Sequence, residues 1–118
     1  MKGGVISGLV ILLLVCLTAA NSVTVCQYVD GAVDVLTDCS VEDTDVLQSE
    51  HERFERLEPF LSATLSDDHL HGITDSFIEC ITYSELGEIP EAEAAKNRLL
   101  SALNEIKRFS TFNIKSIL

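Results

Sequence analysis

Cysteine thiols are the residues of this chain with the clearest capacity for chemistry, and their number depends on where the mature protein begins. Four occur in the 118 residues, and the first, Cys16, lies in an apolar N-terminal run. The other three are Cys26, Cys39 and Cys80. Thiols in an oxidising compartment are expected to pair, and three cannot all pair within one molecule. The sequence therefore predicts one intramolecular disulfide and one residual thiol.

Helix geometry selects the partners in that disulfide. Cys26 and Cys39 are 13 residues apart in a segment that we expect to be helical. At 1.5 Å per residue they would lie about 19 Å apart, whereas a disulfide needs a Cα separation of about 4.4 to 6.8 Å. In a bundle the first and third helices run parallel, which brings Cys39 towards Cys80. We therefore predict a Cys39–Cys80 disulfide, which closes a loop of 41 residues and contributes about 4 kcal/mol.

Cys26 is then left without an intramolecular partner, and two interpretations remain open. An intermolecular disulfide would give a homodimer or a covalent link to a partner chain, and closeness to the mature N-terminus favours this. A buried free thiol that packs as a small hydrophobic side chain is the alternative, and the position of Cys26 on an apolar stripe favours it.

The only cluster that resembles metal ligands contains two histidines and three aspartates. His69 and His71 are two residues apart and would point to different sides of a helix, unlike the i, i+4 pair of metal-binding helices. Asp67, His71 and Asp75 share one face, but it lies opposite the apolar face of the same segment, as expected for a solvated surface. Asp68 is close to them in the sequence, and we predict no metal site and no cofactor.

No arrangement of residues indicates catalysis. The chain has no Gly-x-Ser-x-Gly, no His-Glu-x-x-His and no phosphate-binding glycine loop. His51, near Glu55 and Glu58, is expected to be a surface residue of a polar helix. We predict a protein that is not an enzyme.

The dibasic pair Lys107–Arg108 is a possible processing site, since secreted precursors are often cut after two bases. A cut here would release residues 109–118 as a peptide. The competing interpretation is that both bases complement the negative C-terminal end of a helix dipole, and it is favoured because Phe109 continues the apolar stripe.

The N-terminal residues have the features of a secretory signal peptide. Lys2 gives a positive start, residues 5–17 are apolar but too few to span a bilayer, and Thr18–Ala20 are small residues suited to cleavage. We predict a signal peptide at 1–20, a helical domain at 21–109 and a C-terminal tail at 110–118. The mature protein would be secreted and extracellular, without a membrane anchor.

Four amphipathic segments predict an all-α fold, a small disulfide-stapled bundle of about four helices. The first runs from Ser22 to about Cys39, although its β-branched residues make a strand the competitor. The second would begin at a capping box at residues 40–43 and be broken or re-aimed by Pro59 near Glu58. The third would begin at Ser66 and stop at Gly87, and the fourth would run from Pro90 to about 109. The tail at 110–118 would be an extended strap or a flexible end.

Charge limits the classes of partner. The chain carries 19 acidic and 8 basic residues, a net charge of −11. Residues 21–93 hold 18 of the acids, whereas residues 94–118 hold five bases and one acid. Nucleic acid is excluded as a partner, and the net charge opposes binding to anionic membranes. The acidic stretches 42–58 and 85–93 would instead complement a basic surface.

Compartment, size and missing catalytic motifs together indicate a small acidic secreted protein that acts by binding an extracellular partner protein. An effector of the venom, salivary or immune type has these properties. Two alternatives are a carrier of a small hydrophobic ligand, since four amphipathic helices can enclose a cavity, and a peptide precursor cut at Lys107–Arg108.

Overall fold

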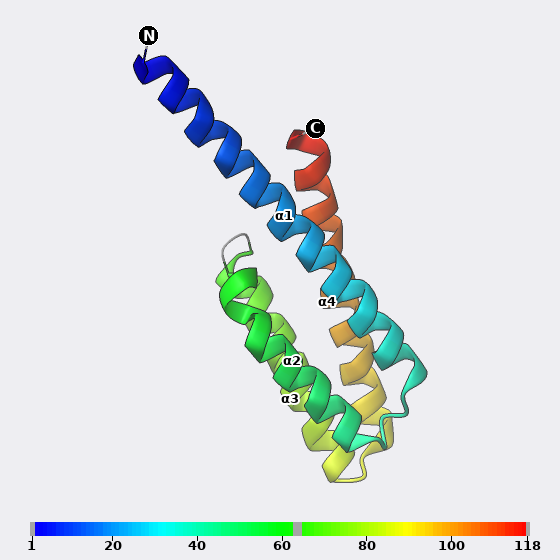
Figure 1. The fold of residues 1–118 in the computed structure, drawn as a ribbon. Coiled ribbons are helices and arrows are strands. Elements are labelled where there is room, and N and C mark those ends of the chain that lie inside the picture. Colours follow the sequence, from blue (N-terminus) through cyan, green and yellow to red (C-terminus); the bar gives the residue numbers. More distant parts are fainter. Residues whose placement is uncertain (1, 63–64, 118) are drawn as a thin grey trace.

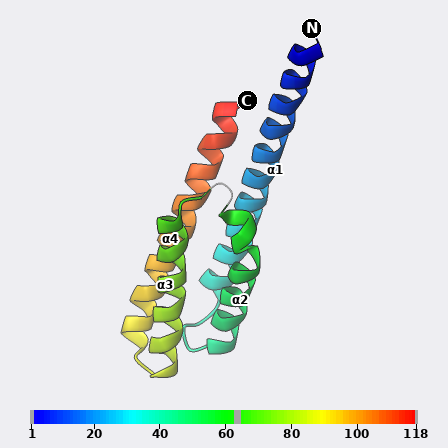
Figure 2. The ribbon, with the colours of Figure 1, turned by 90° about the vertical axis from the view of Figure 1, so that its left-hand side faces the viewer.

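The predicted all-α architecture is confirmed. The computed structural model describes residues 2–62 and 65–117, which form four helices and no strand. These are α1 (Lys2–Asp38), α2 (Thr44–Leu61), α3 (Asp67–Glu85) and α4 (Ile89–Ile117). The helices alternate in direction, and each packs against its neighbours in the chain, while α4 also packs against α1 (Figures 1 and 2). The first amphipathic segment is therefore helical, and the competing strand is wrong.

Helix α1 is continuous but belongs to the bundle only along its second half. Its N-terminal half projects beyond the other helices (Figure 1), and residues 3–17 are all exposed. The first buried side chain of the described residues is Ser22, and burial then recurs at Val25, Val29, Ala32 and Leu36. Taken over its whole length, α1 is long and apolar enough to cross a membrane, a property that signal sequences near an N-terminus share.

Apolar side chains from all four helices fill the centre of the bundle. Phe54 of α2 and Phe77 of α3 are fully buried with ring centroids 5.9 Å apart, and Tyr28 of α1 lies 6.4 Å from Phe54. The contribution of α4 is a stripe at three- and four-residue spacing, which consists of Ala92, Ala95, Leu99, Leu103 and Ile106. Burial of this stripe against α1 and α3 is the main stabilising contribution of α4.

The predicted boundaries of α3 are confirmed at both ends. Ser66 is the N-cap, and its Oγ accepts a hydrogen bond from the backbone N–H of His69. At the other end Gly87 has φ +74°, a left-handed conformation that residues with a Cβ avoid. The N–H of Gly87 donates to Ser84 O and that of Glu88 to Tyr83 O, which is the Schellman arrangement.

Helix α2 differs from its prediction at both ends. It begins one turn later than the proposed capping box, with Asp43 as N-cap, because Ser40 Oγ accepts from the N–H of Glu42 in the preceding turn. Pro59 does not end the helix, which continues to Leu61. Pro59 lies in the final turn, where only one hydrogen bond is lost, and burial of Leu61 in the core offsets that loss.

The C-terminal residues continue α4 to Ile117 and are neither a strap nor a separate tail; Leu118 lies outside the described residues. Helix α1 offers them a packing surface, since Ser110 is buried and Thr111 lies against Cys26. The buried stripe passes from Ile106 to Ser110, four residues on, so Phe109 points outward and is 41 % exposed. Its predicted place in the core is therefore wrong.

Candidate functional site

The predicted disulfide partners lie at the closed end of the bundle, which we define as the end carrying the α1–α2 and α3–α4 connections. Cys39 follows α1 directly, and Cys80 of α3 is fully buried in the core against which Cys39 packs. Both approach the same part of α4. The Cys80 thiol donates to Ala92 O at 3.5 Å, and one turn later Lys96 Nζ donates to Cys39 O at 2.7 Å.

All four cysteines are free thiols in this structure. Burial raises the pKa of the Cys80 thiol, the nearby Cys39 raises it further, and Lys96 opposes both effects. The pKa of Cys39 is also raised by burial, against the charge of Lys96. A thiol with a raised pKa is a poor nucleophile, so these two side chains are not suited to redox catalysis. Their environment suits a structural role.

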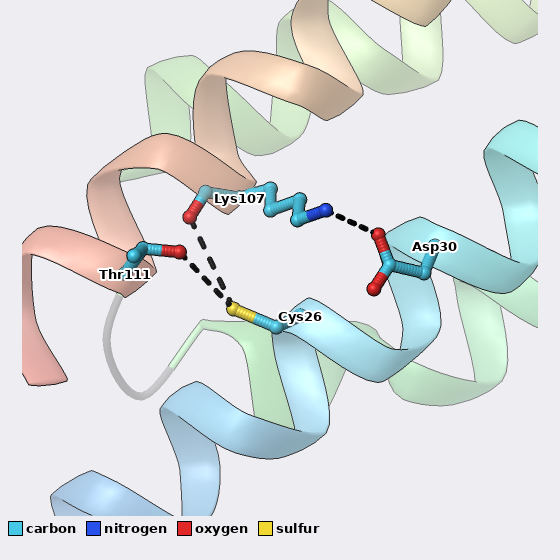
Figure 3. A network of polar contacts seen from close by, with 4 residues as sticks. All are labelled: Cys26, Asp30, Lys107 and Thr111. Atoms are coloured by element: carbon cyan, nitrogen blue, oxygen red, sulfur yellow. Dashed lines mark hydrogen bonds and ion pairs between the residues drawn. The ribbon is translucent and has the colours of Figure 1, made fainter.

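Cys26 of α1 lies in the contact between α1 and α4, where its thiol faces Thr111 and the backbone of Lys107 (Figure 3). Its Sγ is 3.6 Å from Thr111 Oγ1 and 4.0 Å from Lys107 O, and the side chain is partly buried. Helix α1 is continuous from Cys26 to Asp38, as the sequence analysis assumed. The rise of that helix therefore holds Cys26 and Cys39 too far apart to form a disulfide. The intermolecular disulfide and the packed thiol remain alternatives.

The dibasic pair lies inside a helix. Lys107 Nζ donates to Asp30 Oδ1 of α1 at 2.5 Å, and this hydrogen bond raises the pKa of Lys107 (Figure 3). Arg108 is exposed. Proteases cleave most readily at exposed loop tips, so cutting after Arg108 would require local unfolding of α4.

The two histidines of α3 differ in their surroundings. His69 Nδ1 lies 3.0 Å from Ser66 Oγ at the helix start, and its ring is 6.0 Å from that of Phe109. His71 is exposed. Within residues 2–62 and 65–117, no three His, Cys, Asp or Glu side chains are grouped so that they could hold a metal ion.

A polar cluster between α1 and α2 was not predicted; it consists of the buried Tyr28 and Glu50 and the partly exposed Arg53. Tyr28 is 3 % and Glu50 is 7 % exposed. Glu50 Oε1 is 3.9 Å from Arg53 Nη1, and the guanidinium lies 5.5 Å from the centre of the Tyr28 ring. The Tyr28 hydroxyl and Glu50 Oε2 have no hydrogen-bond partner among the described residues.

The electrostatics of this cluster follow from its burial. Burial first, and then the negative charge of Glu50, raise the pKa of Tyr28, while Arg53 opposes them. Burial also raises the pKa of Glu50, again against Arg53. Ionisation of Glu50 is therefore less favourable than it is in water, and the charge of Arg53 only partly offsets the effect of burial.

The sequence did contain a signal for this cluster. Glu50 occupies the apolar stripe of α2, three residues after Leu47 and four before Phe54, so a helical projection places it facing the core. The neighbouring His51 was expected at the surface and is instead half-buried. Its ring stacks on Phe77 at 5.3 Å, while Nε2 is 3.2 Å from Glu55 Oε1.

Carboxylates from two distant parts of the sequence gather at the closed end. We call this group the acidic cap; its members are all exposed, and they are Asp38, Glu42, Asp43, Asp45, Glu85, Glu88 and Glu91. Side-chain contacts hold the two connections together, because Ser84 Oγ donates to Val41 O and lies 2.8 Å from Thr44 Oγ1. Gln48 Nε2 also donates to Glu85 Oε1 at 3.1 Å.

This geometry defines a small four-helix domain with an acidic end. Comparison with protein-family models, with curated proteins and with solved structures found no match to this chain. Its function is therefore inferred from its own residues and their arrangement.

Proposed function

We propose that this protein is a small secreted non-enzymatic domain that binds a basic surface of an extracellular partner protein through its acidic cap. The observation that carries the proposal is the convergence of two groups of acids at one end of the bundle, one within residues 38–45 and the other within residues 85–91. Clustered charge of one sign raises the rate of encounter with an oppositely charged partner and selects against others.

The distribution of burial supports secretion after removal of residues 1–20. Residues 3–17 contribute nothing to the core, and the first buried side chain is Ser22, two residues beyond the expected cleavage site. Cleavage after Ala20 would therefore leave the bundle intact. An apolar helix of this kind near the N-terminus is compatible with a signal sequence.

A Cys39–Cys80 disulfide is part of this proposal. The two thiols are near enough to influence one another electrostatically and both lie against the first turns of α4. In the oxidising extracellular environment a cross-link here would tie the end of α1 to α3 and stabilise the surface that carries the acidic cap.

The test compares two variants with the same net charge. In the cap variant, Glu42→Gln, Asp43→Asn and Glu88→Gln remove three charges from the closed end. Binding of a fluorescent lysine-rich peptide is then measured by anisotropy at low and at physiological salt. We expect weaker binding and a smaller salt dependence than for the unchanged protein, because attraction by the cap is screened by salt.

The control variant removes three exposed acids that lie outside the cap, by Glu52→Gln, Asp75→Asn and Glu105→Gln. We expect it to bind the peptide nearly as well as the unchanged protein. Equal losses in the two variants would show that only net charge matters, and would refute a binding surface at the closed end.

Secretion and processing are tested on the product of cells that express the full chain. Its intact mass should correspond to a chain beginning at Asn21, two mass units below the fully reduced value. Retention of the protein in the membrane fraction would contradict secretion, and a fragment of residues 109–118 would establish the precursor alternative. Electrophoresis with and without reductant reports whether Cys26 links two chains.

A further inference from the structure

Ser40 is an exposed hydroxyl among the carboxylates of the acidic cap. It lies in the α1–α2 connection, residues 39–43, which joins the two helices at the closed end (Figures 1 and 2). Glu42 and Asp43 follow it at the second and third positions. Val41 is buried, whereas the serine and both acids are exposed. The hydroxyl and two carboxylates are therefore presented together on the outside of one short connection.

The other hydroxyls followed by acids are less accessible than Ser40. No other serine or threonine of the chain has a glutamate two positions after it. Ser66 has an aspartate there, but its Oγ accepts from the N–H of His69 and lies 3.0 Å from the Nδ1 atom of the same residue. Ser49 and Ser76 have an acid at the third position, but both are inside helices. To present a helical serine to an enzyme, the helix would have to unfold locally.

The surroundings of Ser40 suit both transfer of a group to its hydroxyl and an anionic product. Among the described residues, the only hydrogen bond of Ser40 Oγ is the one that it accepts from the N–H of Glu42, at 3.2 Å. A cation lies next to the same peptide unit, because Lys96 Nζ of α4 donates to Cys39 O at 2.7 Å, and the carbonyl carbon of Cys39 is bonded to the nitrogen of Ser40. An anionic group on Ser40 would therefore have an ammonium group close by, as well as carboxylates.

We propose that Ser40 is a phosphorylation site for an acidophilic protein kinase of the secretory pathway, and that the phosphate pairs with Lys96 and strengthens the acidic cap. A kinase with a basic substrate groove would be attracted by Glu42 and Asp43, and would reject a hydroxyl in basic surroundings. The phosphate adds a charge of about −1.5 to −2 at neutral pH and three acceptor oxygens. This inference rests on the proposed function, because it assumes export of the protein and a basic partner.

The reaction is transfer of the γ-phosphoryl group of ATP to the serine. Ser40 Oγ forms a bond to the γ-phosphorus, and the bond between that phosphorus and the oxygen bridging to the β-phosphorus breaks, so that ADP leaves. A base of the kinase accepts the hydroxyl proton. The product is a phosphate monoester beside Lys96, and an ammonium group that donates to phosphate oxygens forms a charge-assisted hydrogen bond.

The first experiment locates the phosphate on protein secreted by cells that express the full chain. Its intact mass is measured before and after treatment with alkaline phosphatase, and we expect the loss of one HPO₃ group. Ser40→Ala and Glu42→Gln should be secreted without the phosphate. Two controls should retain it, namely Ser66→Ala and Asp45→Asn, which removes a cap acid outside the recognised positions. An unphosphorylated secreted protein, or phosphate that Ser40→Ala retains in full, would overturn the proposal.

Binding of the fluorescent lysine-rich peptide tests the effect of the phosphate on the cap. The phosphorylated protein should bind at least about threefold more tightly than its phosphatase-treated form, since the added charge makes further exposed ion pairs. Equal binding by the two forms would overturn this role of the phosphate. The cap and control variants of the proposed function are compared after phosphatase treatment, so that test does not depend on the modification. Absence of phosphate from a protein whose cap still binds the peptide would overturn this inference alone.

Thermal melts test the pairing of the phosphate with Lys96. Removal of the phosphate should lower the Tm of the unchanged protein more than that of Lys96→Gln, because without the ammonium group the phosphate adjoins only carboxylates. Lys115→Gln removes a base from the last turn of α4, far along the helix from Lys96, and should behave like the unchanged protein. Equal changes in Tm for Lys96→Gln and the unchanged protein would refute the ion pair.

Discussion

Replacement of Tyr28 by Phe should make the protein more stable, although it removes a polar group from a cluster of polar residues. The Tyr28 side chain is 3 % exposed, and its hydroxyl has no hydrogen-bond partner among the described residues. The phenyl ring that remains keeps the position against Phe54, at 6.4 Å, and beneath the Arg53 guanidinium, at 5.5 Å. The substitution therefore removes a desolvated donor and leaves the packing in place.

The size of the effect follows from the burial of that hydroxyl. A buried polar group without a partner costs about 1 to 3 kcal/mol, whereas loss of an ordinary hydrogen bond destabilises by about 1 kcal/mol. We expect Tyr28→Phe to raise the free energy of unfolding by about 1 kcal/mol, which corresponds to roughly 4 to 8 °C in Tm for a domain of this size. Glu50 lies close enough to affect the pKa of Tyr28, so the two residues are expected to be energetically coupled.

The assay is urea unfolding followed by circular dichroism, with Tyr83→Phe as the matched control. Tyr83 is only partly buried, so its hydroxyl is expected to reach water and its loss should change stability by less than about 0.5 kcal/mol. The double variant Tyr28→Phe with Glu50→Gln measures the coupling. A loss of 1 kcal/mol or more in Tyr28→Phe alone would refute the reasoning, since it would show that the hydroxyl makes a stabilising bond.

Three further predictions concern other parts of the fold. Because burial raises the pKa of Glu50, the folded state binds the carboxyl proton more tightly than the unfolded state, so stability falls as pH rises from the usual carboxyl pKa through the raised one. Glu50→Gln should therefore be about 1 kcal/mol more stable than the unchanged protein at neutral pH. Denaturant titrations at several pH values should show this advantage disappear in acid. Gly87→Ala should destabilise the protein by about 1 kcal/mol, because the backbone at residue 87 has a positive φ. Gly72→Ala should stabilise it by about 0.5 to 1 kcal/mol, because Gly72 is in a helix and a Cβ there would meet open space. Thermal melts in which both variants shift Tm in the same direction would contradict this pair of predictions. For the proposed Cys39–Cys80 disulfide, reductant should lower the stability of the secreted protein by about 4 kcal/mol. The same reductant should leave the stability of the double variant Cys39→Ser with Cys80→Ser unchanged. Alkylation of Cys80 in denaturant without reductant would disprove the bond.

The helix boundaries that could be predicted are those whose signals are local. These signals are Ser66 before two aspartates, Gly87 after an apolar stripe and Pro90 in a first helical turn. Each starts or ends a helix through the backbone groups next to it, so the neighbouring sequence is enough to predict the boundary. Pro59 was misjudged because the signal for a break is local, whereas burial of Leu61, which extends the helix past it, depends on α1 and α3 being present.

The candidate sites divide in the same way. The separation of Cys26 from Cys39 was predictable from helix rise alone. The position of Cys39 against the core that contains Cys80 followed once three helices were assumed to alternate. The orientation of Phe109 was not predictable from apolar spacing, because the stripe of α4 continues equally well through Phe109 or Ser110. Contact with α1 decides between them, and it selects Ser110.

By itself, the sequence determined the helical class, the apolar N-terminal segment and the separation of acidic and basic residues along the chain, because each is a property of residue types at short spacing. Only the tertiary structure decided that the acids of two distant stretches meet at the closed end. It also enclosed Glu50 beside Tyr28. These arrangements depend on which faces of antiparallel helices meet, and that is fixed by the packing of one core against all four helices at once.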